Sequence, residues 1–163
     1  MSYRNKVPHR AEIVARLIRE NEYKNIAEIG VRDGETAMIL ALTSGVSNYL
    51  LVDINRDTIL TEWIRRRKKK IFNYVIRTSV LAAVDVLDKS LDLVFIDAAH
   101  DYEHIAEDIK AWLPKVREGG ILCGHDYLPG EYDGVVKAVD ETFEKVDVEK
   151  DTVSAVWSIK ICK

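Results

Sequence analysis

The sequence has few cysteines, no long apolar run and no low-complexity stretch. Its two cysteines, Cys123 and Cys162, fit neither a disulfide framework nor a metal-binding spacing, so reduced thiols are expected. The first ten residues contain no apolar core of signal-peptide length, and no segment approaches the roughly 20 apolar residues of a membrane-spanning helix. These absences argue against a secreted or membrane-spanning protein and predict a cytoplasmic location.

A strong excess of either charge is also missing. The 24 lysines and arginines against 27 aspartates and glutamates give a formal net charge of -3, which argues against a generally basic surface for nucleic acid or acidic membranes. The local exception is RRRKKK at residues 65–70. Cations in the last turn of a helix complement its dipole, so this run predicts a solvated helix end and leaves RNA contact as the alternative.

What is present is typical of a folded globular chain. At 163 residues, with 47% hydrophobic and 31% charged residues, the chain has the length and composition of one domain, and we expect a single domain over residues 1–163.

Helical and strand patterns alternate along the sequence. Apolar residues recur at helical spacing near residues 13–18, 59–64 and 105–113, and helix formers fill 35–42 and 135–143. Short apolar segments predict strands at 25–30, 49–53, 74–76, 91–96, 121–123, 145–148 and 153–161.

Strands separated by helices of about ten residues indicate right-handed βαβ units and a parallel sheet. The last two strands are joined only by a short turn, so they should pair antiparallel. The fold class predicted is α/β: a Rossmann-like three-layer sandwich with a mostly parallel seven-stranded sheet and one antiparallel strand near the C-terminus.

In such sheets a ligand sits beyond the carboxyl ends of the strands, so the residues that follow each strand are the candidates. After the first strand, Gly30 and Gly34 lie in a turn that leads into a helix, whose N-terminus suits a carboxylate or phosphate. About twenty residues later Asp53 ends the second strand, at the separation from which an acid can reach ribose hydroxyls.

Each of these signals has a structural alternative, namely an ordinary strand-to-helix turn and a helix cap. Together, in this order, they predict a cofactor that carries a nucleoside. The glycine spacing is not the G-x-G-x-x-G of dinucleotide sites, which argues against the rival, an NAD-dependent oxidoreductase. Ser79 follows the third strand, where it could meet an adenine edge or simply cap a helix.

Two acids and two histidines follow the fourth and fifth strands: Asp97, His100, His125 and Asp126. If they share one rim of the sheet, either histidine could accept a proton near neutral pH, with Asp97 or Asp126 orienting it. The alternatives are structural histidines, or a divalent cation held by Asp97 and Asp126, for which oxygen ligands favour Mg²⁺ and an added imidazole favours metals such as Mn²⁺.

Three segments resemble the class I S-adenosylmethionine (SAM)-dependent methyltransferases, and in particular a small bacterial and archaeal branch. They are AEIGVRDGETA at 27–37, LVDIN at 51–55, and LDLVFIDAAHDYEHIAEDIKAWLPKVREGGILCGHDY at 91–127. The likeness covers about residues 24–161, which implies a Rossmann-like core there, preceded by an N-terminal helix within 1–23. In the first segment Arg32 stands where the family often has a middle glycine.

The resemblance implies that SAM is the cofactor. By it, Glu28, Gly30 and Gly34 hold the methionine end of SAM, and Asp53 binds its ribose. Further cofactor contacts are expected from Ile54, Ser79 and Asp97.

The expected reaction is methyl transfer to a hydroxyl oxygen of a small molecule or sugar, with His100 or His125 as base and Asp97 orienting it. Related O-methyltransferases place metal-binding acids at the positions of Asp97 and Asp126, which implies Mg or Mn as an optional ion. The expected partner is a small-molecule acceptor, without nucleic acid or membrane, and a homo-oligomer is left open. A noncatalytic SAM-binding protein and an RNA methyltransferase are the alternatives.

Overall fold

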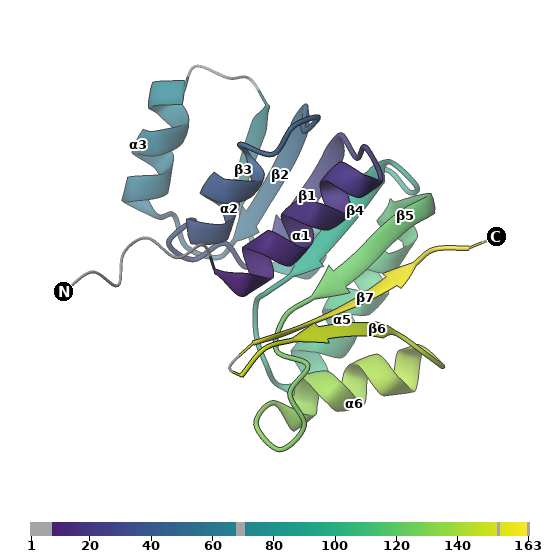
Figure 1. Ribbon diagram of the computed structural model, residues 1–163. Helices are drawn as coiled ribbons and strands as arrows, with labels where there is room; N and C mark the ends of the chain where they lie inside the picture. The colour runs from purple at the N-terminus through teal and green to yellow at the C-terminus, as the bar shows by residue number, and fades with distance from the viewer. Residues whose placement is uncertain (1–7, 68–70, 153, 163) are drawn as a thin grey trace.

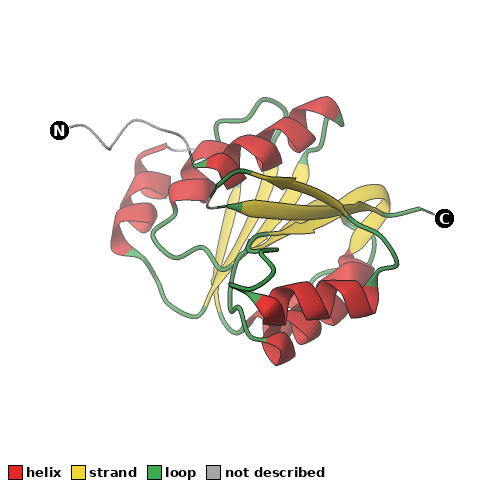
Figure 2. Ribbon diagram, turned by 60° about the horizontal axis from the view of Figure 1, so that its bottom comes forward, coloured by secondary structure: helices red, strands yellow, loops and turns green. Residues whose placement is uncertain are grey.

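The computed structural model describes residues 8–67, 71–152 and 154–162. Over these residues one seven-stranded sheet, in the order β3-β2-β1-β4-β5-β7-β6, lies between two layers of helices (Figures 1 and 2). The strands are β1 Asn25–Ile29, β2 Asn48–Asp53, β3 Phe72–Ile76, β4 Leu91–Ile96, β5 Val116–Gly124, β6 Asp147–Lys150 and β7 Ala155–Lys160. The helices are α1 His9–Glu20, α2 Glu35–Leu40, α3 Thr58–Arg67, α4 Ser79–Val84, α5 Tyr102–Trp112 and α6 Asp133–Thr142, with a 3₁₀ turn at Leu113–Lys115.

The sheet has the predicted mixed topology. Strands β1 to β5 pair in parallel, whereas β7 pairs antiparallel with both β5 and β6. The α/β fold class and the single reversed strand are therefore confirmed. The parallel strands place their carboxyl ends on one edge, which is where the site forms.

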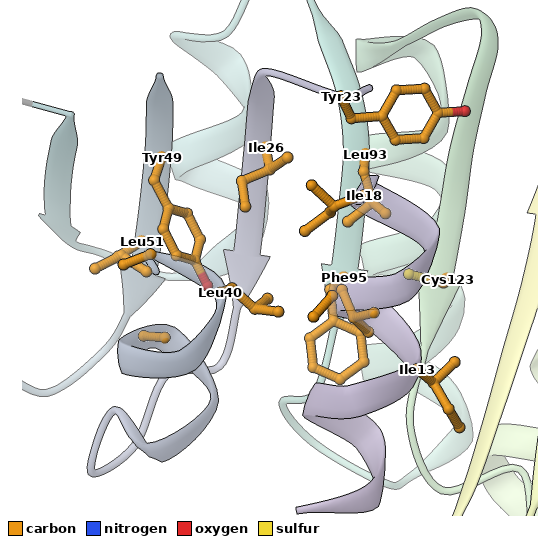
Figure 3. Close-up of a cluster of buried hydrophobic side chains, with 14 of the residues drawn as sticks. Ile13, Ile18, Tyr23, Ile26, Leu40, Tyr49, Leu51, Leu93, Phe95 and Cys123 are labelled. Carbon is orange, nitrogen blue, oxygen red and sulfur yellow. The ribbon is translucent and has the colours of Figure 1, made fainter. Parts of the chain in front are cut away.

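Alternation along the strands separates the core into two clusters. Leu93 and Phe95 pack with residues of α1, α2 and α3 on one face of the sheet. Figure 3 shows them with Ile13 and Ile18 of α1 and Leu40 of α2, and α1 crosses that face over β1 and β4 (Figure 1). Val94 and Ile96 pack with α4, α5 and α6 on the other face. Because successive side chains of a strand point to opposite faces, an apolar run such as LVFI supplies both clusters at once.

Three local expectations differ from the structure. The glycine pair at 119–120 lies inside β5 rather than before it, at an irregularity in the β4–β5 register. Helix α2 ends at Leu40, two residues before the predicted end at residue 42. The six-residue helix α4 was not predicted, because it is too short to show a helical period.

Among the described residues, no helix combines the length and the apolar character that crossing a membrane would require.

Candidate functional site

A cavity of about 810 Å³ opens at the carboxyl ends of the first four strands. This volume is within the range of small-molecule and cofactor sites. Of the residues predicted to bind the cofactor, five line it: Gly30, Asp53, Ile54, Ser79 and Asp97. The cavity therefore lies at the edge of the sheet where the sequence predicted a binding site.

Gly30 allows two neighbouring strand ends to approach closely. Its φ is +83°, and a Cβ atom there would lie 2.2 Å from the Asp97 carbonyl oxygen. The Asp97 N–H in turn donates to the Ile29 carbonyl at 2.8 Å. A side chain at residue 30 would therefore push β1 and β4 apart at the mouth of the cavity.

Asp53 fixes the turn that follows β1. The N–H groups of Val31 and Arg32 each donate to its Oδ2 at 2.8 Å, and the N–H of Asn55 donates to Oδ1 at 2.9 Å. A carboxylate has about four acceptor sites, so these three hydrogen bonds leave Asp53 able to accept another. Arg32 has a φ of 52°, so this position has a left-handed backbone, which glycine adopts more readily than other residues.

Glu28 and Gly34, both within the described chain, lie outside the cavity lining. Glu28 is 1% exposed and accepts a hydrogen bond from the Tyr49 hydroxyl, because alternation along β1 turns it toward the α1–α2 face with Ile26. A Cβ atom on Gly34 would lie 2.7 Å from the Leu60 side chain. Neither residue lies on the cavity wall, and the direct cofactor contact expected of them stays a prediction.

Burial raises the pKa of Glu28 to about 8, and the hydrogen bond from Tyr49 only partly offsets this. Because the pKa of Glu28 in the folded state exceeds its usual 4.5, its contribution to the stability of the fold is fully present below pH 4.5. This contribution is lost as the pH rises from 4.5 toward 8. We expect Glu28→Gln to gain stability relative to the wild type across this window, by at most about 1.4 kcal/mol per pH unit. Urea denaturation of both proteins at a series of pH values tests this, and parallel curves would contradict it.

At the β3 end of the cavity, Ser79 is held by side chains of α5. Its Oγ accepts a hydrogen bond from Trp112 Nε1 at 2.8 Å, and its hydroxyl also bonds with the Asp108 carboxylate. Asp108 and His104 line the cavity as well. Sequence reasoning missed these two residues, since it considered only positions that directly follow strands.

The four predicted polar residues after β4 and β5 converge, and Asp126 is at their centre. His100 Nε2 lies 2.7 Å from Asp126 Oδ2, and His125 Nδ1 lies 2.9 Å from Asp126 Oδ1. His125 Nδ1 is also 3.5 Å from Asp97 Oδ1. Asp97 belongs both to this cluster and to the cavity wall, so it connects the two.

The two histidines differ in their freedom to act. Both ring nitrogens of His125 are engaged, because Nε2 lies 2.9 Å from Ser154 Oγ. Burial lowers the pKa of His125, but hydrogen bonds and charges of Asp126 and Asp97 outweigh it and raise the pKa to about 9. A histidine that is already protonated at neutral pH is a poor base, which argues against His125 in that role. The His100 side chain is 47% exposed and packs beside the Tyr132 ring.

Arg10, on the N-terminal helix α1, reaches the same cluster. Its Nε lies 3.1 Å from Asp97 Oδ2 and donates to Thr36 Oγ1 at 3.0 Å. The guanidinium thus ties Asp97 to the start of α2. No local pattern in the sequence signals this contact, because the two residues are far apart in the chain.

Asp97, His100 and Asp126 lie close enough together that they could hold a metal ion. One ligand atom from each lies within 4.8 Å of the others. Two carboxylates and an imidazole suit Mn²⁺ better than Mg²⁺. His100 was not among the ligands expected from sequence.

Comparisons with known proteins indicate the family and the fold of the chain. A family described as "Methyltransferase domain" matches residues 27–127. A protein of Acanthamoeba polyphaga mimivirus, "Uncharacterized protein R132", is 20% identical over 118 residues, which are 66% of this chain and 53% of the relative. The chain therefore spans about half the length of this curated relative.

Several solved structures share the fold. A SAM-dependent O-methyltransferase from Thermotoga maritima has a TM-score of 0.72 at 14% identity, covering 99% of this chain and 68% of that one. An O-methyltransferase from Bacillus cereus in complex with S-adenosylhomocysteine (SAH) has a TM-score of 0.70 at 16% identity, covering 98% and 84%. The N-methyltransferase NodS from Bradyrhizobium japonicum WM9 has a TM-score of 0.72 at 13% identity, covering 94% and 95%.

O-methyltransferases and an N-methyltransferase thus match this chain with similar TM-scores, so the shared fold does not identify the acceptor atom. The family match spans the glycine turn, Asp53, and the strand ends that carry Asp97 and His125, and the fold agrees with it over nearly the whole chain. This chain belongs to the class I SAM-dependent methyltransferase family.

Proposed function

We propose that the chain transfers a methyl group from SAM to a hydroxyl oxygen of a small molecule or sugar. The observation that carries the proposal is the His100–Asp126 pair at 2.7 Å, which adjoins Asp97 on the cavity wall. A hydroxyl needs a base when it is methylated, and an oriented histidine beside the cofactor cavity can supply one.

SAM supplies an activated methyl group on a sulfonium with a good leaving group, so the protein mainly aligns the reactants and excludes water. The turn at Gly30 would hold the methionine end, and the remaining acceptor site of Asp53 would take a ribose hydroxyl. Ile54, an apolar side chain that is 67% exposed, would cover one face of the adenine ring of SAM.

His100 is the base in this proposal. Asp126 Oδ2 would accept a hydrogen bond from the His100 Nε2–H, which leaves Nδ1 with the lone pair that takes the proton of the acceptor hydroxyl. Asp97, held by Arg10, would position the acceptor hydroxyl at the edge of the cavity. His125 remains a positioning residue that holds Asp126 and Asp97 in place.

Calorimetry with SAH and with NAD, followed by transfer of labelled methyl from SAM to a panel of alcohols, sugars and amines, tests this function. We expect SAH to bind, NAD not to bind, and label to appear on a hydroxyl compound. Binding of SAH without transfer to any acceptor would favour a noncatalytic cofactor-binding protein. Transfer to RNA, with affinity that falls steeply with salt, would favour an RNA methyltransferase.

A second way to activate the acceptor is a divalent cation on Asp97, His100 and Asp126, whose ligand atoms are close enough. Such an ion would lower the pKa of a hydroxyl bound to it. In the structure, however, Arg10 pairs with Asp97, and both histidines pair with Asp126. Arg10 and the protonated His125 already balance the charges of the two carboxylates.

We therefore expect turnover to stay within about twofold after dialysis against a chelator, because general-base catalysis needs no ion. Turnover is measured before chelation, after it, and after addition of Mg²⁺ or Mn²⁺. A loss that Mn²⁺ restores would identify His100 as a ligand rather than the base.

A further inference from the structure

Strand β3 forms one edge of the sheet, and among the described residues it pairs with β2 alone (Figure 1). Just before it, the Ile71 carbonyl accepts a hydrogen bond from the Tyr49 N–H at 2.6 Å. Just after it, the Arg77 N–H donates to the Asp53 carbonyl at 3.0 Å. Backbone groups alternate in direction along a strand, so the odd-numbered residues face β2. The residues whose N–H and carbonyl groups face the open side are therefore Phe72, Tyr74 and Ile76.

The two edges of the sheet differ in how well they are protected against pairing with another chain. Strand β6, at the far edge, has the sequence DVEK, and all four of its residues are exposed. Charged side chains of this kind keep a second strand away from an edge. Strand β3 has the sequence FNYVI, which contains neither a charge nor a proline. Its edge is therefore open to a further strand.

Apolar surface continues from this edge onto α4. Its exposed apolar residues follow helical spacing and are 41–79% exposed; this α4 stripe consists of Val80, Leu81, Val84 and Leu87. Beside it, a hollow of about 330 Å³ lies between α4 and strands β2 and β3. The apolar residues of its lining include Leu50, Phe72, Val75, Ala82 and Val86. The edge, the stripe and the hollow together supply most of the roughly 20 to 30 residues that a stable interface uses on each side.

The charges around this surface favour a copy of the same chain over a strongly basic or acidic partner. Arg77 Nη1 lies 2.6 Å from Asp85 Oδ2, and Lys115 Nζ lies 2.7 Å from Asp88 Oδ1. These charges are balanced within the chain, so they neither attract a partner of one sign nor repel a second copy. A two-fold dimer is also the commonest assembly of identical chains.

We propose that two copies of this chain dimerise through β3, which pairs antiparallel with β3 of the second copy, while the two α4 stripes cover the junction. The two-fold axis passes beside Tyr74, the middle residue of β3. Because both backbone groups of Tyr74 face outward, the two tyrosines can exchange a pair of hydrogen bonds, and Phe72 then lies opposite Ile76 of the second copy. The antiparallel direction also separates the cationic ends of α3, at residues 65–67, from each other. The dimer does not depend on the methyl-transfer reaction.

The first test is the oligomeric state, measured by sedimentation of the full chain between about 1 and 100 μM. We expect the wild type to be a dimer at about 10 μM. Leu81→Glu should weaken the dimer at least about 100-fold, because it places an unpaired charge in the apolar junction. Leu42→Glu is the matched control, since Leu42 is 58% exposed against 59% for Leu81 but follows α2 on the other face of the sheet. Its dimer should be as tight as that of the wild type.

The second test identifies the strand, by hydrogen exchange of single amides measured by NMR. In the wild-type dimer the amides of Phe72, Tyr74 and Ile76 should exchange at least about 10-fold more slowly than in monomeric Leu81→Glu, because only the dimer gives them acceptors. The amides of Asn73, Val75 and Arg77 face β2 in both states, so their protection should not depend on the dimer. Dilution of the wild type to its monomer gives the same comparison without a substitution.

Three outcomes would overturn the proposal. A wild type that stays monomeric at about 100 μM would do so, and would favour a different protein as the occupant of this surface. A dimer that Leu81→Glu leaves intact would place the interface elsewhere. A dimer in which the three outward amides of β3 exchange as fast as in the monomer would exclude pairing through this strand.

Discussion

Replacing His100 by alanine is expected to lower kcat by about 10²- to 10⁴-fold, the usual contribution of a general base. Affinity for SAH should stay within about twofold, because His100 touches the Asp126 carboxylate and the Tyr132 ring but does not line the cavity among the described residues. Single-turnover rates at saturating SAM and calorimetry with SAH measure the two quantities separately.

Two further measurements test the role of His100 as the base. Because the His100 side chain is 47% exposed, added imidazole can enter the space that alanine leaves, and it should restore part of the lost rate. His125→Ala should instead lower thermal stability, since His125 bridges Asp126, Asp97 and Ser154. An unchanged kcat in His100→Ala would contradict its role as base.

The fold was predictable because the pattern of apolar residues in each segment indicates which of its faces are buried. The run LVFI in β4 is apolar at every position, which indicates a strand covered on both faces, and the structure buries all of it. The short turn before β7 likewise forced an antiparallel pair. Helix α4 was not predicted because its position depends on packing against α5. Its six residues carry little local pattern that would indicate this packing.

The site was predictable only where it is built by strand ends. The topology of a parallel sheet brings Asp53, Asp97 and His125 to one edge. Their position directly after strands was therefore sufficient to predict that they lie near one another. Asp108 and Arg10 come from helices that fold over this edge, and their roles depend on tertiary packing that a single sequence does not state.

Glu28 illustrates a different limit. It was assigned to the cofactor through the resemblance, yet alternation along β1 places it on the same face as Ile26, in the core beside Tyr49. Period-two alternation was visible in the sequence and argued for this placement. The cofactor contact that the resemblance implies for Glu28 therefore stays a prediction.

The second large effect is expected at Gly30. In Gly30→Ala the new Cβ would meet the Asp97 carbonyl oxygen at 2.2 Å and the Ala98 Cα at 2.6 Å, all of it backbone that cannot swing aside. The strand ends must separate, which displaces both Asp97 and the turn held by Asp53. We expect SAH affinity to fall by at least about 100-fold, as a built site loses its geometry, and the free energy of unfolding to fall as well. Calorimetry and urea denaturation measure these changes.

Gly130→Ala is the matched control, because Gly130 also has a φ of +83° but a Cβ there would meet nothing within 4 Å. Both variants carry the strain of a left-handed alanine, about 1–2 kcal/mol. Only Gly30→Ala adds the collision between β1 and β4. The difference in unfolding free energy between the two variants therefore isolates that close approach. Equal losses in both variants, with SAH bound as tightly as by the wild type, would show that the strand ends do not hold the cofactor turn.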